Sequence, residues 1–182
     1  MQFHALPFEG VFEIVLAPSV DERGYFCRTH DVQIFRERGL VADWVQENEA
    51  WSKHPFTIRG LHFQRPPFAE TKLIRVVRGA VWDVFVDLRK SSTTFGKWGA
   101  AELSSENGKM LYLPKGFAHG YCTLTADVKM LYRVDALHAP EQEGGLRWDD
   151  RDLGIQWPKG EPILSAKDRS WPNWAGFIST FD

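Results

Sequence analysis

Apolar and polar residues alternate along much of this chain in short runs, and this period of two constrains the fold more than any other feature of the sequence. In residues 81–88 (VWDVFVDL) every even-numbered position is apolar, whereas the odd-numbered positions alternate between apolar residues and aspartates. Successive side chains of a strand point to opposite faces, so this run predicts a strand with one apolar face and one mixed face. Residues 72–78 behave similarly and predict a neighbouring strand.

Turn signals separate the predicted strands. Asp21-Glu22-Arg23-Gly24, Gly79-Ala80 and Pro114-Lys115-Gly116 each predict a turn or a bulge. One short helix is predicted over 31–38, with Asp31 as its N-cap, and the C-terminal third predicts loops. Many short strands at this spacing are typical of a sandwich or a barrel. The predicted strands are 11–16, 58–64, 72–78, 81–88, 109–113, 119–124 and 128–134.

Length and charge exclude several classes of protein. The 182 residues contain no linker or repeat and fit one domain over 1–182, because a domain usually takes roughly 100–200 residues. The balance of 22 Lys and Arg against 24 Asp and Glu argues against a nucleic-acid partner. No apolar run approaches the ~18 residues of a membrane span, no signal peptide is recognisable, and two cysteines make no disulfide framework. We therefore expect a cytoplasmic protein without membrane contact.

Two segments combine histidine with glycine and charged residues. The first is Arg59-Gly60-Leu61-His62-Phe63-Gln64, which Glu70 and Lys72 follow. Residues two apart in a strand share a face, so His62 and Gln64 are expected to point the same way, with Gly60 leaving room for a ligand. In the second segment, 113–121 (LPKGFAHGY), Pro and Gly make a turn and His119 opens the next strand.

These spacings resemble the two motifs of the cupins, which implies an all-β jelly-roll barrel with a few short helices. Many cupins bind a metal, and the resemblance offers one hypothesis of a metal-dependent enzyme that uses His62, Gln64, Glu70 and His119. An amide is a weak metal ligand, which counts against Gln64 in such a set. A sugar- or nucleotide-binding jelly roll without catalytic activity is another hypothesis, and it predicts binding without chemistry.

A closer resemblance spans the chain from about residue 10 to 170. Seven stretches occur in the order found in the dTDP-4-dehydrorhamnose 3,5-epimerase family. This family consists of cupins that work without a metal or other cofactor, usually as homodimers, on nucleotide-linked 4-keto-6-deoxyhexoses. The stretches are 21–26 (DERGYF), 59–64 (RGLHFQ), 72–76 (KLIRV), 83–89 (DVFVDLR), 95–98 (FGKW), 114–120 (PKGFAHG) and 163–168 (ILSAKD).

The resemblance implies a role for each group that the family's reaction needs. Protons leave and return at C3 and C5 beside the C4 ketone, which requires a base, a group that stabilises the enolate oxygen and an acid on the opposite ring face. The resemblance implies His62 as the base and Asp168 as the carboxylate that orients it. Lys72 would lie beside the C4 oxygen, and Tyr132 would be the acid. Asp83 is either a second partner of the active-site histidine or a plain buried polar residue.

The resemblance also implies a substrate-binding set. Arg23 and Arg59 match phosphate-binding arginines, whose guanidinium forks suit phosphate oxygens, and in the family the segment of Arg23 can come from the neighbouring subunit. Gln46 and Asn48 match an element that contacts the nucleotide. The whole set is Arg23, Phe26, Arg28, Gln46, Asn48, Arg59, His119, His138 and Lys167.

Two positions of this set depart from the family pattern, and both belong to its nucleobase site. The family often has Glu shortly after the Arg-Gly-x-Phe segment, where this chain has Arg28, and it often has paired tyrosines where this chain reads Leu137-His138-Ala139. Arg28 donates hydrogen bonds where a carboxylate would accept them. The nucleotide therefore stays open between dTDP and another nucleoside diphosphate such as CDP, and so does the choice between C3, C5 or both.

Overall fold

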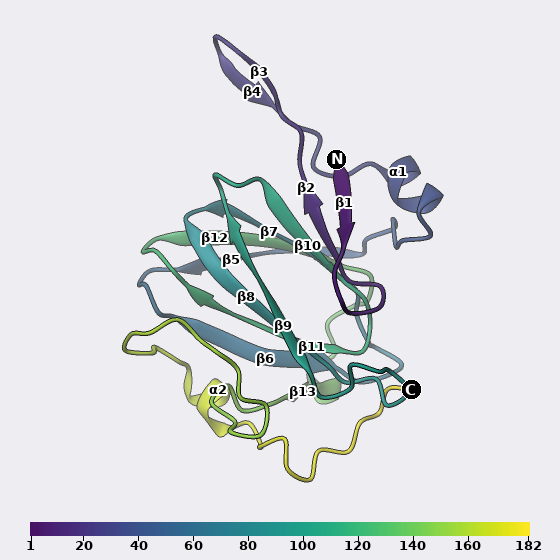
Figure 1. Cartoon of the computed structure of the whole chain (residues 1–182), viewed down its shortest axis with the longest axis vertical. Helices are drawn as coiled ribbons and strands as arrows, with labels where there is room; N and C mark the ends of the chain where they lie inside the picture. The colour runs from purple at the N-terminus through teal and green to yellow at the C-terminus, as the bar shows by residue number, and fades with distance from the viewer.

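The structure, a computed structural model that describes residues 1–182, consists of two antiparallel sheets that pack face to face (Figure 1). The larger sheet has six strands in the spatial order β1-β2-β10-β7-β12-β5, and the smaller has five in the order β13-β6-β11-β8-β9. This arrangement confirms the expected all-β jelly roll. The larger sheet contains β1 (Gln2–Ala5), β2 (Phe12–Val15), β5 (Gln46–Ser52), β7 (Lys72–Arg78), β10 (Lys109–Leu113) and β12 (Val128–Val134). The smaller contains β6 (Ile58–Gln64), β8 (Ala80–Asp87), β9 (Trp98–Ser104), β11 (Phe117–Thr123) and β13 (Glu143–Gly145).

All seven predicted strands are present, whereas six further strands were not predicted. Two of the six show why. The segment that forms β5 reads QENEAWS and carries too few apolar residues to show a buried face, because it lies at the edge of its sheet. The segment that forms β9 begins WGAA, and its small residues make room for aromatic neighbours: a Cβ at Gly99 would lie 2.5 Å from the Phe85 ring. Small residues carry little hydrophobic periodicity, so the strand is hard to recognise from sequence.

The core occupies three layers, and β8 contributes to two of them. Its residues Val81 and Phe85 point into the space between the sheets, where they pack with residues of β7, β10 and β12. Val84 and Val86 point the other way and lie under residues 146–182, which follow the last strand and are called the C-terminal arm here, against Trp157 among others. The mixed face of β8 is therefore the inner one, and its aspartates are carried into the interior of the barrel.

The remaining elements lie outside the two sheets. Helix α1 (Val32–Glu37) begins after Asp31, whose side chain accepts hydrogen bonds from the amides of Gln33 and Ile34, as the predicted N-cap requires. The second helix, α2 (Ala166–Ser170), and the 3-10 turn η1 (Pro140–Gln142) belong to the C-terminal third. None of the helices has the length and apolar character needed to cross a lipid bilayer.

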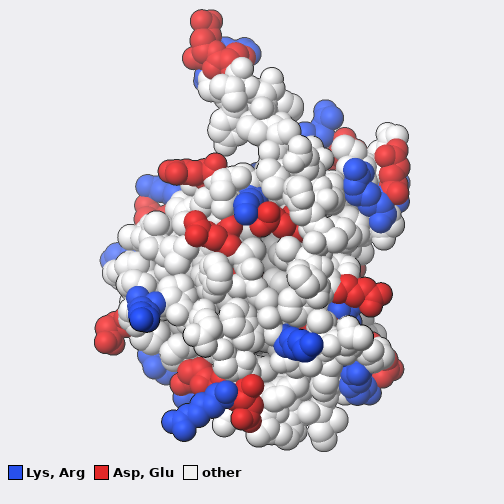
Figure 2. Space-filling view, viewed as in Figure 1, with Lys and Arg blue, Asp and Glu red and all other residues white.

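A two-stranded hairpin of β3 (Ser19–Asp21) and β4 (Gly24–Phe26) projects from the body of the molecule (Figure 1). Its turn coincides with the predicted one at 21–24. Val20, Tyr25 and Phe26 on this hairpin are each more than 70 % exposed. Acidic and basic side chains are interspersed over the face seen in Figure 2, and both signs occur at the tip of the hairpin.

Candidate active site

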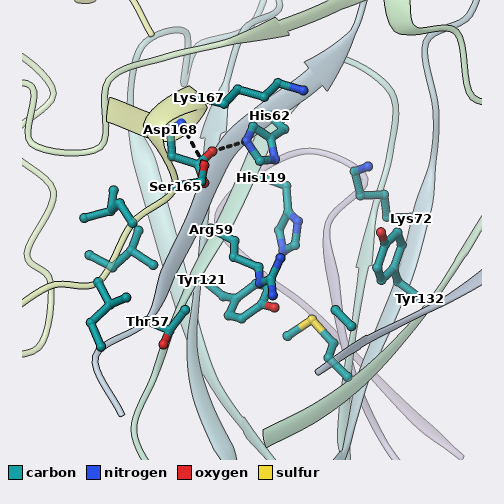
Figure 3. A pocket seen from close by; sticks show the side chains of 15 residues that line it. Thr57, Arg59, His62, Lys72, His119, Tyr121, Tyr132, Ser165, Lys167 and Asp168 are labelled. Atoms are coloured by element: carbon teal, nitrogen blue, oxygen red, sulfur yellow. Dashed lines mark hydrogen bonds and ion pairs between the residues drawn. The ribbon is translucent and has the colours of Figure 1, made fainter. Parts of the chain in front are cut away.

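A cavity of about 500 Å³ lies between the two sheets beside α2. Strands β6 and β11 of the smaller sheet supply one wall, and β5, β7 and β12 of the larger sheet supply the opposite wall (Figure 3). The cavity brings together all four residues of the implied catalytic set, which come from the smaller sheet, the larger sheet and α2. Its lining residues are Ala50, Thr57, Ile58, Arg59, His62, Lys72, His119, Tyr121, Met130, Tyr132, Ile163, Leu164, Ser165, Lys167 and Asp168.

The two histidines of the site are direct neighbours across β6 and β11, where His62 is the partner of His119. The register of this pair shifts between His119 and Tyr121, next to the point where the backbones of Gly60 and Gly120 meet. A Cβ at Gly60 would lie 2.5 Å from the Gly120 Cα, and the φ of Gly60 is +124°. The expectation that Gly60 leaves room for a ligand is therefore wrong, because it makes room for the neighbouring strand and so sets the spacing of the two histidines.

His62 and Asp168 form a close pair although they lie 106 residues apart in the sequence. The His62 Nε2 is 2.5 Å from the Asp168 Oδ1, and the Ser165 hydroxyl donates a hydrogen bond to the other carboxylate oxygen at 2.8 Å. Burial raises the pKa of Asp168, but the hydrogen bonds from His62 and Ser165 outweigh it and hold that pKa below its ordinary 3.8. The ionised carboxylate can only accept, so Nε2 of His62 carries the shared hydrogen and Nδ1 is left as the basic nitrogen.

Lys72 and Tyr132 occupy the opposite wall of the cavity (Figure 3). Tyr132 pairs with Ile74 across β12 and β7, so Lys72, two residues before Ile74, is its diagonal neighbour on the same face. The Lys72 Nζ lies 5.9 Å from the centre of the Tyr132 ring. Burial, followed by the charge of Glu70, raises the pKa of Tyr132 above 10.0, so its phenol is protonated at neutral pH.

His119 is held by Asp83 on β8. The His119 Nε2 is 2.9 Å from the Asp83 Oδ1, and the Asp83 side chain is fully buried, with no partner for its other oxygen. Burial raises the pKa of Asp83, while the neighbouring His119 and Lys72 lower it by less. Asp83 is therefore not a second partner of His62, as one of the two interpretations had it, and it is not an unpaired buried polar residue either: it is the partner of His119.

Several residues of the implied substrate-binding set lie in or beside the main cavity. Arg59 and Lys167 line it and bring positive charge to its rim. An adjoining hollow of about 300 Å³ is lined by Gln46, Asn48 and His138 and shares residues 62, 72 and 132 with the main cavity. The Gln46 side chain accepts a hydrogen bond from the His138 amide at 2.7 Å, which fixes these two residues together.

Three residues of that set lie away from the cavity of their own chain. Arg23 is at the tip of the projecting hairpin, with 84 % of its side chain exposed and Asp21 as its ion-pair partner. Phe26 is on the same hairpin and is 71 % exposed. Arg28 follows the hairpin, and its nearest acidic group is Asp31, at 3.5 Å. None of these three residues lines the cavity or the adjoining hollow of its own chain.

The alternative of a metal site gains no support from the donor geometry. Gln64 is buried and engaged with the backbone, since its amide donates to the Phe68 and Leu137 carbonyls and accepts from the Ala139 amide. His62 and His119 are each paired with an aspartate, and Glu70 is paired with Lys72. No group of three His, Cys, Asp or Glu side chains is arranged to hold a metal ion.

Sequence reasoning assigned no role to Ser165 or Tyr121. Ser165 caps α2: its hydroxyl donates a hydrogen bond to the Asp168 carboxylate and accepts one from the Asp168 amide. A Ser three residues before an acidic residue is a recognisable capping pattern. Tyr121 lines the cavity and contacts the Ser52 hydroxyl at 3.4 Å. It lies at the end of the second histidine segment, two residues beyond His119, so the shared-face rule could have identified it.

Comparison with known proteins places these features in a family. A family model described as dTDP-4-dehydrorhamnose 3,5-epimerase matches residues 5–176. The enzyme of that name from Sinorhizobium fredii is 49% identical over 154 residues, which cover 84% of this chain and 79% of that protein.

Solved structures agree in fold. The crystal structure of the Bacillus anthracis dTDP-4-dehydrorhamnose 3,5-epimerase with TDP and PPi bound has a TM-score of 0.92 and 41% identity, over 94% of this chain and 98% of that one. A 3,5-epimerase from Legionella pneumophila in complex with dTDP-4-keto-L-rhamnose has a TM-score of 0.90 and 34% identity, over 94% and 92% of the two chains.

Proposed function

The chain belongs to the dTDP-4-dehydrorhamnose 3,5-epimerase family, and from this premise we propose how it inverts carbons beside the ketone of a nucleotide-linked 4-keto-6-deoxyhexose. The observation that carries the mechanism is that an imidazole–carboxylate pair and a protonated phenol lie on opposite walls of one cavity (Figure 3). Inversion at carbon requires removal of a proton from one face and its return to the other. Each of the two sheets of the barrel supplies the group that acts on one of those faces.

The first step is proton removal by His62. Its Nδ1 takes the proton from the carbon next to the C4 ketone, and the electrons of the broken C–H bond form the enolate. The imidazolium that results is stabilised by Asp168, which is 2.5 Å from the other ring nitrogen. The Lys72 ammonium, on the opposite wall, stabilises the negative charge that develops on the C4 oxygen.

The second step is proton return from the opposite face. The Tyr132 hydroxyl has no hydrogen-bond partner within the chain and is free to donate its proton to the enolate carbon. Its raised pKa keeps the proton on the oxygen until the enolate forms. A new C–H bond then replaces the old one with inverted configuration. The His62 imidazolium releases its extra proton to solvent, and the Tyr132 phenolate takes one from solvent.

The nucleotide part of the substrate extends from this centre over the adjoining hollow. Gln46, Asn48 and His138 line that hollow, and Arg59 and Lys167 provide cations for the diphosphate. The relatives act on dTDP-linked sugars by name, and dTDP is the nucleotide that we propose here. Competition between dTDP, UDP and CDP for the same cavity tests this choice directly.

We also propose a homodimer in which the hairpin of one copy reaches the cavity of the other. A two-stranded hairpin is marginally stable alone, and this one exposes Val20, Tyr25 and Phe26 to solvent. A second subunit would cover these side chains and would bring Arg23 to the diphosphate. Cys27 and Cys122 are both free thiols, which favours the reducing environment of the cytoplasm.

Solvent exchange tests the proposed function. The protein is incubated with dTDP-4-keto-6-deoxyglucose in deuterated water, and NMR measures deuterium at C3 and C5 together with the configuration of each carbon. We expect deuterium at one or both carbons with inversion, and loss of exchange by about 10²–10⁴-fold in His62→Ala. Absence of exchange with the dTDP, UDP and CDP forms of the substrate would refute the proposal.

A further inference from the structure

Three basic side chains on the walls of the cavity are each paired with a carboxylate. His62, the proposed base, is paired with Asp168, and His119, a residue of the implied substrate-binding set, is paired with Asp83. The third pair joins Lys72 to Glu70. The mechanism so far gives Glu70 no function.

We propose that Glu70 is a positioning residue that fixes the Lys72 ammonium where the C4 oxygen of the substrate develops negative charge. This inference rests on the proposed function, because it concerns the same enolate. Glu70 itself lies behind Lys72 and lines the adjoining hollow rather than the main cavity, so it acts through the lysine.

The geometry of the pair supports such a role. The Lys72 Nζ donates to the Glu70 Oε1, and the two side chains are only 10 % and 14 % exposed. A lysine has four rotatable side-chain bonds and loses rotamer entropy when it is held in one place. A buried ammonium without a partner is also unfavourable. The carboxylate therefore offsets the cost of holding the charge at one point.

Glu70 is held in turn by its surroundings. The Gln64 amide nitrogen is 3.5 Å from the second Glu70 oxygen, and three bonds to backbone groups fix that amide. Between Glu70 and Lys72, the Thr71 amide donates a hydrogen bond to the Asp135 carboxylate at 2.7 Å, which anchors the chain just before β7 begins. Gln64 thus belongs to the support of Lys72, and this explains why a buried amide occupies a position that a cupin metal site gives to histidine.

The same carboxylate also acts on the proton donor. Lys72 lies between Glu70 and the Tyr132 ring, whose centre is 5.9 Å from the ammonium. The negative charge of Glu70 is one of the causes that raise the pKa of Tyr132. Burial is the larger cause of the raised pKa of Tyr132, so the phenol stays protonated without Glu70, and the catalytic effect that we expect of Glu70 passes through the lysine.

The test is a double-mutant cycle on the exchange reaction, with Glu70→Ala, Lys72→Ala and the double variant. We expect Glu70→Ala to lower kcat by about 10- to 100-fold with little change in KM, the size of effect that a misplaced catalytic group produces. In the Lys72→Ala background, Glu70→Ala should cause no further loss, because its effect passes through the lysine. Glu70→Gln should recover most of the loss, since its amide oxygen can still accept from Lys72.

A matched control removes a carboxylate elsewhere. Glu106 is exposed in the turn between β9 and β10, and Glu106→Ala should leave kcat and KM unchanged. An unchanged kcat in Glu70→Ala would overturn the proposal, and so would the same fractional loss with and without Lys72, or a Glu70→Gln variant as slow as Glu70→Ala. Exchange by the unmodified protein distinguishes a failure of the Glu70 proposal from a failure of the proposed function. If the proposed function is wrong, the unmodified protein shows no exchange. If only the role of Glu70 is wrong, the unmodified protein exchanges deuterium and the variants give one of the refuting results.

Discussion

Replacement of Asp168 by asparagine isolates the charge of the carboxylate that supports the proposed base. The substitution keeps the shape of a side chain that is only 6 % exposed and removes the ionised acceptor 2.5 Å from the His62 Nε2. A hydrogen bond to a charged group contributes about 1.5–3 kcal/mol, and 1.36 kcal/mol corresponds to tenfold in rate. If that contribution is made mainly to the imidazolium formed during proton removal, kcat falls by about 10- to 100-fold.

The assay is the rate of deuterium incorporation at saturating substrate, followed by NMR. KM should change little, because the Asp168 carboxylate is engaged with His62 and Ser165 and stabilises a charge that forms only during proton removal. Asp152 is an exposed aspartate on the C-terminal arm, and Asp152→Asn is the matched control, for which kcat should not change. An unchanged kcat in Asp168→Asn, or a rise in KM alone, would show that the pair does not act in proton removal.

The pH dependence of stability provides an independent check on the same carboxylate. The pKa of Asp168 is lowered in the folded protein, so its charge stabilises the fold above the ordinary value of 3.8, and this contribution disappears as the pH falls through the folded-state pKa. The Asp168→Asn variant should therefore melt below the unmodified protein at pH 7, by ~2–4 °C for each kcal/mol lost. The difference in Tm should narrow below pH 3.8.

Three further outcomes test other parts of the site. Tyr132→Phe should still incorporate deuterium with retained configuration, because His62 can return a proton to the face from which it removed one. Inversion should slow by about 10²-fold or more. Inversion at the normal rate would exclude Tyr132 as the donor. Inactive His62→Ala and Arg23→Ala proteins, mixed and allowed to exchange subunits, should recover activity, because one mixed cavity then holds both native residues; no recovery would argue against a shared site. Gly60→Ala should lower the urea midpoint by the equivalent of ~1–3 kcal/mol and reduce activity. Gly24 has a similar φ but open space around it, so Gly24→Ala is the control that separates the clash with the Gly120 backbone from the strain of the positive φ.

The sequence alone was sufficient to predict the class of fold and most of the basic residues that line the cavity. Alternation with a period of two depends on local geometry only, so strands such as β8 and β12 were recognisable wherever both apolar residues and turns were present. It failed for β5 and β9, where an edge position and the space taken by an aromatic ring replaced the apolar pattern. The Asp31 cap of α1 was predictable for the same local reason, because a cap bonds to amides two and three residues away.

The carboxylate partners, by contrast, were decided by the tertiary structure. Asp168 was identified through a resemblance, but its contact with His62 spans 106 residues and no local pattern encodes it. The pairing of Asp83 with His119 and of Glu70 with Lys72 depends on strand register and on burial, which together determine whether a charge needs a partner. Chain neighbours and periodicity specify which face a side chain occupies, whereas the packing of one sheet on another specifies what it meets there.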